Sequence, residues 1–259
     1  MVIAACGAFT SEPAAATDGG ADTPDAAAEA SAVDSGSKDE TCEILFTDDF
    51  TTLGAFDPQS NDAGPATLSK DPAHAVNAPS LAAMGKLARG GGYLNSSASR
   101  DVMLPAAFAI GQRVELEYEL FIENPVDTYA EVGCTLQMFD AQGVRTRLLL
   151  GLPANAAIEA TYDPPDAAAK SLTRTVFATR GAGDYRVKTT LAATSARTAN
   201  LHYEVRTETA DFTDAPIQAG IDRLRLVCGI DYAISDASSP VTLRVWVDDV
   251  VVRRCIPKP

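Results

Sequence analysis

The sequence predicts an all-β protein: an antiparallel jelly-roll β-sandwich preceded by a disordered N-terminal linker. In residues 42–259, about ten short apolar stretches have strand-like patterns, clusters of Gly, Asn, Asp, Pro and Ser separate most of them, and no helices alternate with them. Residues 7–41 hold almost no large apolar side chain. We therefore divide the chain into residues 1–6, a linker at 7–41 and one sandwich domain at 42–259.

The clearest strand is residues 114–123, where apolar side chains and glutamates alternate strictly. This period of two is typical of an antiparallel strand with one buried face. Residues 128–139 and 144–152 read as two strands joined by a hairpin, and the turn at 140–143 ends in Gly143, where we expect a positive φ. Further strands are expected at 42–50, 174–179, 184–194, 200–209, 222–230 and 241–253.

The linker is polar and acidic. It carries eight carboxylates against the single cation Lys38, in a chain whose formal net charge is −14. Such a composition cannot bury enough apolar surface to offset the entropy lost on folding, so we expect disorder. The same negative charge repels phosphate backbones, which argues against a nucleic-acid partner.

Residues 3–6, Ile-Ala-Ala-Cys, resemble the lipobox of bacterial lipoproteins, and a polar linker follows directly. The resemblance implies a lipid on Cys6 that anchors the protein to a membrane of the cell envelope. Gly7 in place of an aspartate implies sorting to the outer membrane. A signal peptide needs an apolar segment of about 7–15 residues, so we expect the true start to lie upstream of Met1.

Four cysteines remain beyond Cys6, and four allow three connectivities. Cys42 opens the domain and Cys255 closes it, while Cys134 and Cys228 both lie in strand-like stretches. We predict the disulfides Cys42–Cys255 and Cys134–Cys228, with buried free thiols as the alternative. Disulfides agree with an exported protein.

The first and last predicted strands resemble the paired end strands of concanavalin A-like jelly rolls, the laminin-G-like lectin and glucanase class. The smaller galactose-binding-like jelly roll is the alternative. If Cys42 lies opposite Cys255, then Phe46 faces Val251 and Asp48 faces Asp249. Facing carboxylates repel, so a bulge, hydrogen bonds to the backbone, arginine partners or a structural calcium ion is needed there.

Glu115, Glu117 and Glu119 alternate on one strand, as in some jelly-roll glycoside hydrolases. That resemblance implies a nucleophile at Glu115, a helper at Glu117 and an acid/base at Glu119. The family usually has Asp in the middle and several Trp in its cleft, whereas the single Trp246 here lies far along the chain. The alternative is an ordinary solvated outer face.

Other catalytic signals are absent from the sequence: it contains no Gly-x-Ser-x-Gly motif and no zinc-like Cys/His spacing. Candidates for contacts with a sugar are Tyr93, Asn95, Tyr129, Tyr162, Tyr185 and Tyr232. We therefore expect an envelope lipoprotein whose non-catalytic β-sandwich binds a glycan or an envelope protein, with no cofactor besides that calcium. A glycoside hydrolase built on Glu115, Glu117 and Glu119, or a purely structural envelope protein, is the alternative.

Overall fold

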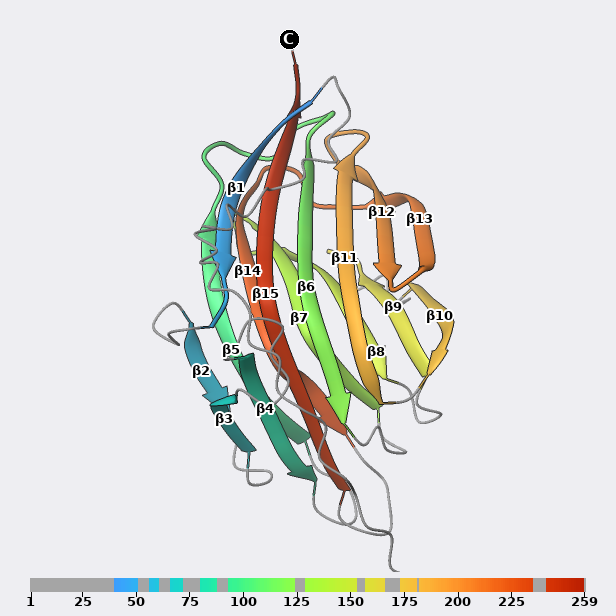
Figure 1. Ribbon diagram of the computed structural model, residues 1–259. Coiled ribbons are helices and arrows are strands. Elements are labelled where there is room, and N and C mark those ends of the chain that lie inside the picture. The colour runs from blue at the N-terminus through green and yellow to red at the C-terminus, as the bar shows by residue number, and fades with distance from the viewer. Residues whose placement is uncertain are drawn as a thin grey trace, which may run out of the picture. The chain divides into compact units, whose positions relative to one another are not determined.

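The computed structural model describes residues 40–50, 56–60, 66–71, 80–87, 93–123, 129–152, 157–165, 173–180, 182–234 and 241–258. Cys6 and almost all of the predicted linker lie outside these residues. Throughout the described residues the secondary structure is β-strand and turn, which confirms the predicted all-β class (Figure 1). No helix in this part of the chain is long and apolar enough to span a membrane.

The described strands form two antiparallel sheets, packed as a sandwich. Sheet A has the order β13-β12-β11-β6-β15-β4-β3, and β1 pairs with β15. Its strands are β1 (Glu40–Asp48), β3 (Ala66–Asp71), β4 (Ser80–Leu87), β6 (Arg113–Glu123), β11 (Gly183–Ala193), β12 (Thr198–Val205), β13 (Glu208–Pro216) and β15 (Val241–Pro257).

Sheet B forms the other layer, with the order β10-β9-β8-β7-β14-β5-β2 (Figure 1). Its strands are β2 (Asp57–Ser60), β5 (Tyr93–Met103), β7 (Tyr129–Asp140), β8 (Arg145–Leu152), β9 (Ala157–Asp163), β10 (Thr173–Arg180) and β14 (Ile221–Ile234). Neighbours such as β7 and β14 are far apart in sequence, so side chains from distant segments meet on the faces of this sheet.

The core lies between the sheets, and alternation along the strands builds it. On β6, Val114, Leu116, Tyr118, Leu120 and Ile122 are all buried in the core. The strand therefore presents its alternate side chains, including the glutamates, to the outer face, as the sequence predicts.

The hairpin between β7 and β8 follows its turn chemistry. Asp140 Oδ1 accepts hydrogen bonds from the backbone N–H groups of Gln142 and Val144, at 3.0 and 2.9 Å. Gly143 has a φ of +81°, the left-handed conformation that glycine adopts at little cost. This turn sets the register in which β7 and β8 place their outer-face side chains.

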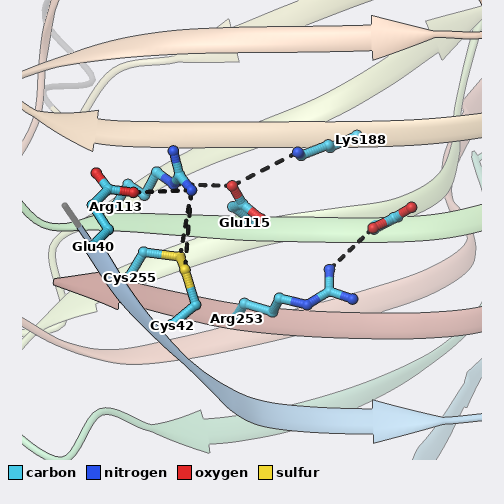
Figure 2. The surroundings of a disulfide bond; sticks show 8 residues. Glu40, Cys42, Arg113, Glu115, Lys188, Arg253 and Cys255 are labelled. Carbon is cyan, nitrogen blue, oxygen red and sulfur yellow. Dashed lines mark hydrogen bonds and ion pairs between the residues drawn. A yellow bond between two sulfur atoms is a disulfide. The ribbon is translucent and has the colours of Figure 1, made fainter. Parts of the chain in front are cut away.

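Both predicted disulfides are present, Cys42–Cys255 between β1 and β15 and Cys134–Cys228 between β7 and β14. Figure 2 shows the Arg113 side chain over the first of them. Its Nη2 lies 3.7 Å from Cys255 Sγ and 3.0 Å from Glu40 Oε2. Arg113 thus ties the first strand and the disulfide to β6.

The end-strand register differs from the expected one. Cys42 faces Cys255, but a bulge between Ile44 and Phe46 shifts the pairing, so that Asp48 faces Val250 instead of Asp249. The shift lets Leu45 and Phe46 both pack against the core, while Ile44 is exposed. The expected facing pair of carboxylates therefore does not form.

Two aspartates of this region accept hydrogen bonds from nearby backbone N–H groups. Asp48 Oδ1 accepts a hydrogen bond from the N–H of Phe50, and Asp248 Oδ1 accepts one from the N–H of Asp249. Among the described residues one group has the spacing of metal ligands: Glu40 with Cys42 and Cys255. Its two sulfurs are joined in the disulfide and are not thiolates, so they are poor ligands.

Candidate functional site

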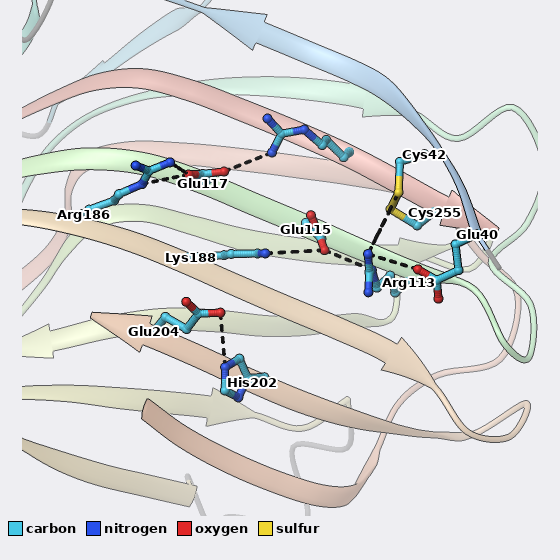
Figure 3. Close-up of polar contacts among 11 residues, drawn as sticks. Glu40, Cys42, Arg113, Glu115, Glu117, Arg186, Lys188, His202, Glu204 and Cys255 are labelled. Atoms are coloured by element: carbon cyan, nitrogen blue, oxygen red, sulfur yellow. Dashed lines mark hydrogen bonds and ion pairs between the residues drawn. A yellow bond between two sulfur atoms is a disulfide. The ribbon is translucent and has the colours of Figure 1, made fainter. Parts of the chain in front are cut away.

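The three glutamates of β6 alternate with its core residues and so lie on the outer face of sheet A. Figure 3 shows Glu115 and Glu117 with cationic side chains beside them. Glu115 Oε1 lies 2.9 Å from Arg113 Nε and 3.7 Å from Lys188 Nζ. Glu117 accepts hydrogen bonds from Arg186 and, at 3.0 Å, from Arg253. The structure thus brings the sequence candidates together, each within an ion-pair network.

The electrostatics of these glutamates differ. Burial alone raises the pKa of Glu117, but hydrogen bonds from Arg186 and Arg253 outweigh it and hold that pKa below its ordinary value. Burial raises the pKa of Glu119, where Arg186 is 3.9 Å away. Glu117 is therefore fixed as an ion-paired carboxylate, and Glu119 binds a proton more readily.

Trp246 is closer to these glutamates than its position in the sequence suggests. β15 pairs with β6, and Trp246 lies opposite Phe121 in the register. The two rings have centroids 5.4 Å apart in an edge-to-face arrangement. An aromatic pair therefore borders the glutamate strand.

The outer face of sheet B has a different character, because polar side chains are buried on it. On β9, Ile158, Ala160 and Tyr162 pack into the core, so Glu159 and Thr161 between them point the other way. Both are nevertheless almost completely buried, with 3% and 0% exposed. Buried polar groups on an outer face require partners and are typical of functional sites.

A cluster around Arg147 occupies this face. From the centre of β8, Arg147 reaches Glu131 of β7 with Nη1–Oε2 at 3.0 Å and Asp163 of β9 with Nε–Oδ2 at 2.8 Å. Asp231 of β14 lies 4.0 Å from the same Nη1. Four strands thus bring three carboxyl groups to one guanidinium, which we call the Arg147 cluster.

Two sugar-contact candidates of the sequence support this cluster. Tyr129 Oη donates to Glu131 Oε1 at 3.4 Å, and Asn95 Nδ2 donates to the backbone oxygen of Asp231 at 2.7 Å. Tyr162 and Tyr185 are instead buried in the core. The side chains of Tyr93 and Tyr232 lie outside the described part of the structure.

Two carboxyl groups of the Arg147 cluster hold protons more tightly than usual. Burial raises the pKa of Glu131, Arg147 opposes the shift, and Asp231 adds to it. Burial likewise raises the pKa of Asp231, although the positive charges of Arg147 and Arg145 oppose the shift. Because both contact the same Nη1, their oxygens lie within about 7 Å of each other, so the negative charge of Asp231 disfavours ionisation of Glu131.

Gln137 of β7 lies beside this cluster, between two arginines. The register places it opposite Arg225 of β14 on one side and Arg147 on the other. Facing residues of an antiparallel pair share one side of the sheet. Among the described residues the Gln137 side-chain amide makes no hydrogen bond. The row formed by Arg225, Gln137 and Arg147 therefore offers a hydrogen-bond donor flanked by two cations.

Most residues of this site are not apparent from the sequence. Glu131 and Gln137 do alternate with apolar residues on β7, the pattern that singled out the glutamates of β6. The available signal was Glu131, Thr135 and Gln137 at alternating positions of an otherwise largely apolar strand. Asp163 and Asp231 carry no such signal, because only the strand order of sheet B brings them to Arg147.

Comparison with known proteins gives no family. No protein-family profile matches the sequence, and no curated protein is significantly similar to it. Solved structures do share the fold. An endo-β-1,4-glucuronan lyase from the fungus Trichoderma reesei has 13% identity and a TM-score of 0.55, covering 84% of this chain and 96% of its own.

Two further structures have comparable scores. An alginate lyase from a Chlorella virus has 10% identity and a TM-score of 0.51, over 81% of this chain and 99% of its own. A carbohydrate esterase of the Shiga toxin-encoding bacteriophage phi24B has 11% identity and a TM-score of 0.51, over 85% and 100%. At such identities the similarity establishes the jelly-roll fold.

These neighbours correct the expected function. The sequence analysis expects a non-catalytic module that binds a glycan or a protein. The three neighbours described above are instead two polysaccharide lyases and a carbohydrate esterase. The non-catalytic expectation is therefore contradicted by the neighbours.

Proposed function

We propose that this protein is an enzyme that cleaves a polysaccharide containing uronic acid by β-elimination, and that the Arg147 cluster is its active site. The observation that carries the proposal is the Glu131–Asp231 pair, two carboxyl groups whose pKa values are raised beside one arginine on an outer sheet face. The lyase neighbours, which act on glucuronan and alginate, support the substrate class.

The chemistry assigns a role to each part of the site. A base removes the C5 proton of a uronic acid unit, the electron pair forms the C4–C5 double bond, the C4–O4 bond breaks, and O4 takes a proton. A carboxyl pair that shares one proton supplies both the base and the acid. Gln137, between Arg225 and Arg147, is placed to stabilise the charge that develops on the substrate carboxylate.

Incubation with glucuronan and with alginate tests the proposal. The elimination product absorbs in the ultraviolet through its new double bond, whereas hydrolysis gives reducing ends without that absorbance. We expect absorbing products from the wild type and a loss of about 100-fold or more in Glu131→Gln and in Asp231→Asn. The matched control Glu123→Gln, on the outer face of sheet A, retains full activity.

Two outcomes contradict the proposal. Reducing ends without absorbance show hydrolysis and overturn elimination. Activity lost in Glu119→Gln but kept in Glu131→Gln moves the site to β6, the site of the glycoside hydrolase alternative. Thermal unfolding of each variant must match that of the wild type, so that a lost activity reports on the chemistry.

We also propose a lipid anchor on Cys6 and a place in the cell envelope, probed independently of the activity. Support comes from the lipobox-like residues 3–6 and the acidic polar stretch that follows. Metabolic labelling with a palmitate analogue, in a form extended upstream of Met1, should label the wild type and not Cys6→Ser. Equal labelling of the two refutes acylation at Cys6.

A further inference from the structure

A row of three residues crosses the outer face of sheet B next to Gln137. Arg223 of β14 lies opposite Phe139 of β7, and Phe139 lies opposite Arg145 of β8. The three side chains therefore share one face, which we call the basic patch. Phe139 is two residues beyond Gln137, so the row is about 7 Å farther along the strand. That step is of the same order as the rise of one sugar unit, and the long arginine side chains can span the difference.

Neighbouring carboxylates neutralise the arginines of the basic patch only in part. Arg225 holds Asp101 through two hydrogen bonds, at 2.6 and 3.1 Å, while Arg223 has one contact to that carboxylate, at 3.2 Å. Arg145 is exposed and has no ion-pair partner among the described side chains. It is two residues before Arg147 on β8, so the two arginines share one face of the sheet.

The Phe139 ring restricts the position of the Arg223 guanidinium. Arg223 Cζ lies 4.5 Å from the centroid of the Phe139 ring, within the range of a cation–π contact. A guanidinium held over a ring loses less side-chain entropy when it binds an anion, because its orientation is already restricted. Arg223 is therefore preorganised to receive a carboxylate.

The basic patch also contrasts with the rest of the chain. A net charge of −14 repels a polyanion, so a polymer of uronic acids needs a local positive surface to approach. Arg145 and Arg223 lie two residues along the strand direction from the row that contains Gln137. A chain that follows β7 brings its next carboxylate to them.

We propose that Arg145 and Arg223 bind the carboxylate of the uronic acid unit next to the one that reacts, and so select polymers with consecutive acidic units. This subsite rests on the proposed function, since it assumes that the polymer lies along β7. Phe139 is a positioning residue that orients Arg223. A neutral sugar at this position gains nothing from the two arginines.

Binding without turnover tests the subsite directly. In the Glu131→Gln background, calorimetry measures Kd for tetrasaccharides of the two uronic acid polymers used above. We expect Arg145→Gln and Arg223→Gln each to raise Kd about tenfold, since each removes a charge-assisted hydrogen bond. The control Arg197→Gln, an equal change of charge in the turn between β11 and β12, changes Kd less than twofold.

The ligand provides a second control. Carboxyl-reduced tetrasaccharides should bind weakly, and neither arginine substitution should weaken them further. If Arg145→Gln and Arg223→Gln bind the acidic tetrasaccharide as Arg197→Gln does, the subsite is refuted, even where the wild type cleaves the polymer. If binding depends on both arginines but the wild type produces no unsaturated ends, the subsite stands and the proposed elimination fails.

Discussion

Replacing Arg147 with glutamine should destabilise the protein in a pH-dependent way. The substitution leaves the carboxyl groups of Glu131, Asp163 and Asp231 without the guanidinium that all three contact, at 3.0, 2.8 and 4.0 Å. Removing one partner of a fully buried ion pair costs about 3–5 kcal/mol. Since the Arg147 side chain remains 17% exposed, we expect a loss of about 3 kcal/mol at neutral pH.

The sign of the pH dependence follows from the raised pKa values. Glu131 and Asp231 have higher pKa values in the folded state than in the unfolded chain, mainly because they are buried. The stability that such groups contribute is present below the unfolded pKa and is lost as pH rises through the folded pKa. Loss of Arg147 raises both folded pKa values further, so the deficit of the variant should grow from about pH 4.5 towards neutrality.

Urea unfolding at about pH 4.5 and about pH 7 measures this deficit. The matched control is Arg186→Gln on sheet A, whose side chain is 71% exposed and whose partner Glu117 keeps Arg253. A surface pair of this kind contributes less than about 1 kcal/mol. A deficit in Arg147→Gln that equals the control, or that does not change with pH, refutes the electrostatic account of the Arg147 cluster.

Two further predictions concern the strands that carry the site and the ends of the domain. Gly133→Ala should cost about 3 kcal/mol, because its φ is +82° and an added Cβ lies 2.6 Å from Tyr118 Oη. Gly143 has a φ of +81° but open space around an added Cβ, so Gly143→Ala should lose only about 1 kcal/mol of stability. Thermal unfolding measures both variants, and equal losses in Gly133→Ala and Gly143→Ala contradict the prediction. Replacing Cys42 and Cys255 by alanine should cost about 5 kcal/mol in urea unfolding, because the bond closes a loop of 213 residues. An unchanged midpoint is inconsistent with this.

Local patterns predicted much of the fold. The alternation on β6 identified the buried face, and the turn at Gly143 identified the hairpin, because each depends on residues that are neighbours in sequence. The pairing of Cys42 with Cys255 followed from their places at the two ends of the domain. These inferences needed no knowledge of the strand order.

Features set by packing between distant strands were beyond the sequence. The bulge between Ile44 and Phe46 forms where Leu45 and Phe46 both contact the core, and no local pattern marks it. Trp246 is distant from Phe121 along the chain, yet the two are opposite in the β15–β6 register. Predicted contacts that depended on these registers therefore failed.

The candidate site illustrates the same limit. Arg147 and Glu131 are 16 residues apart, and adjacent strands bring them together. Asp231 joins them only because β14 inserts beside β7 after a long excursion of the chain through sheet A. The alternating glutamates of β6 gave the stronger sequence signal. They lie on sheet A, not on the sheet of the candidate site, and arginines and a lysine of sheet A stabilise them.

In the proposed function, substrate binds on the outer face of sheet B. Backbone amide NMR of the Glu131→Gln protein, titrated with a uronic acid tetrasaccharide, tests it most directly. We predict that the amide signals of Gln137, Arg147 and Arg225 shift, while those of Glu115 and Glu117 on sheet A do not. Shifts confined to the β6 signals, or no shifts at saturating ligand, would contradict the account.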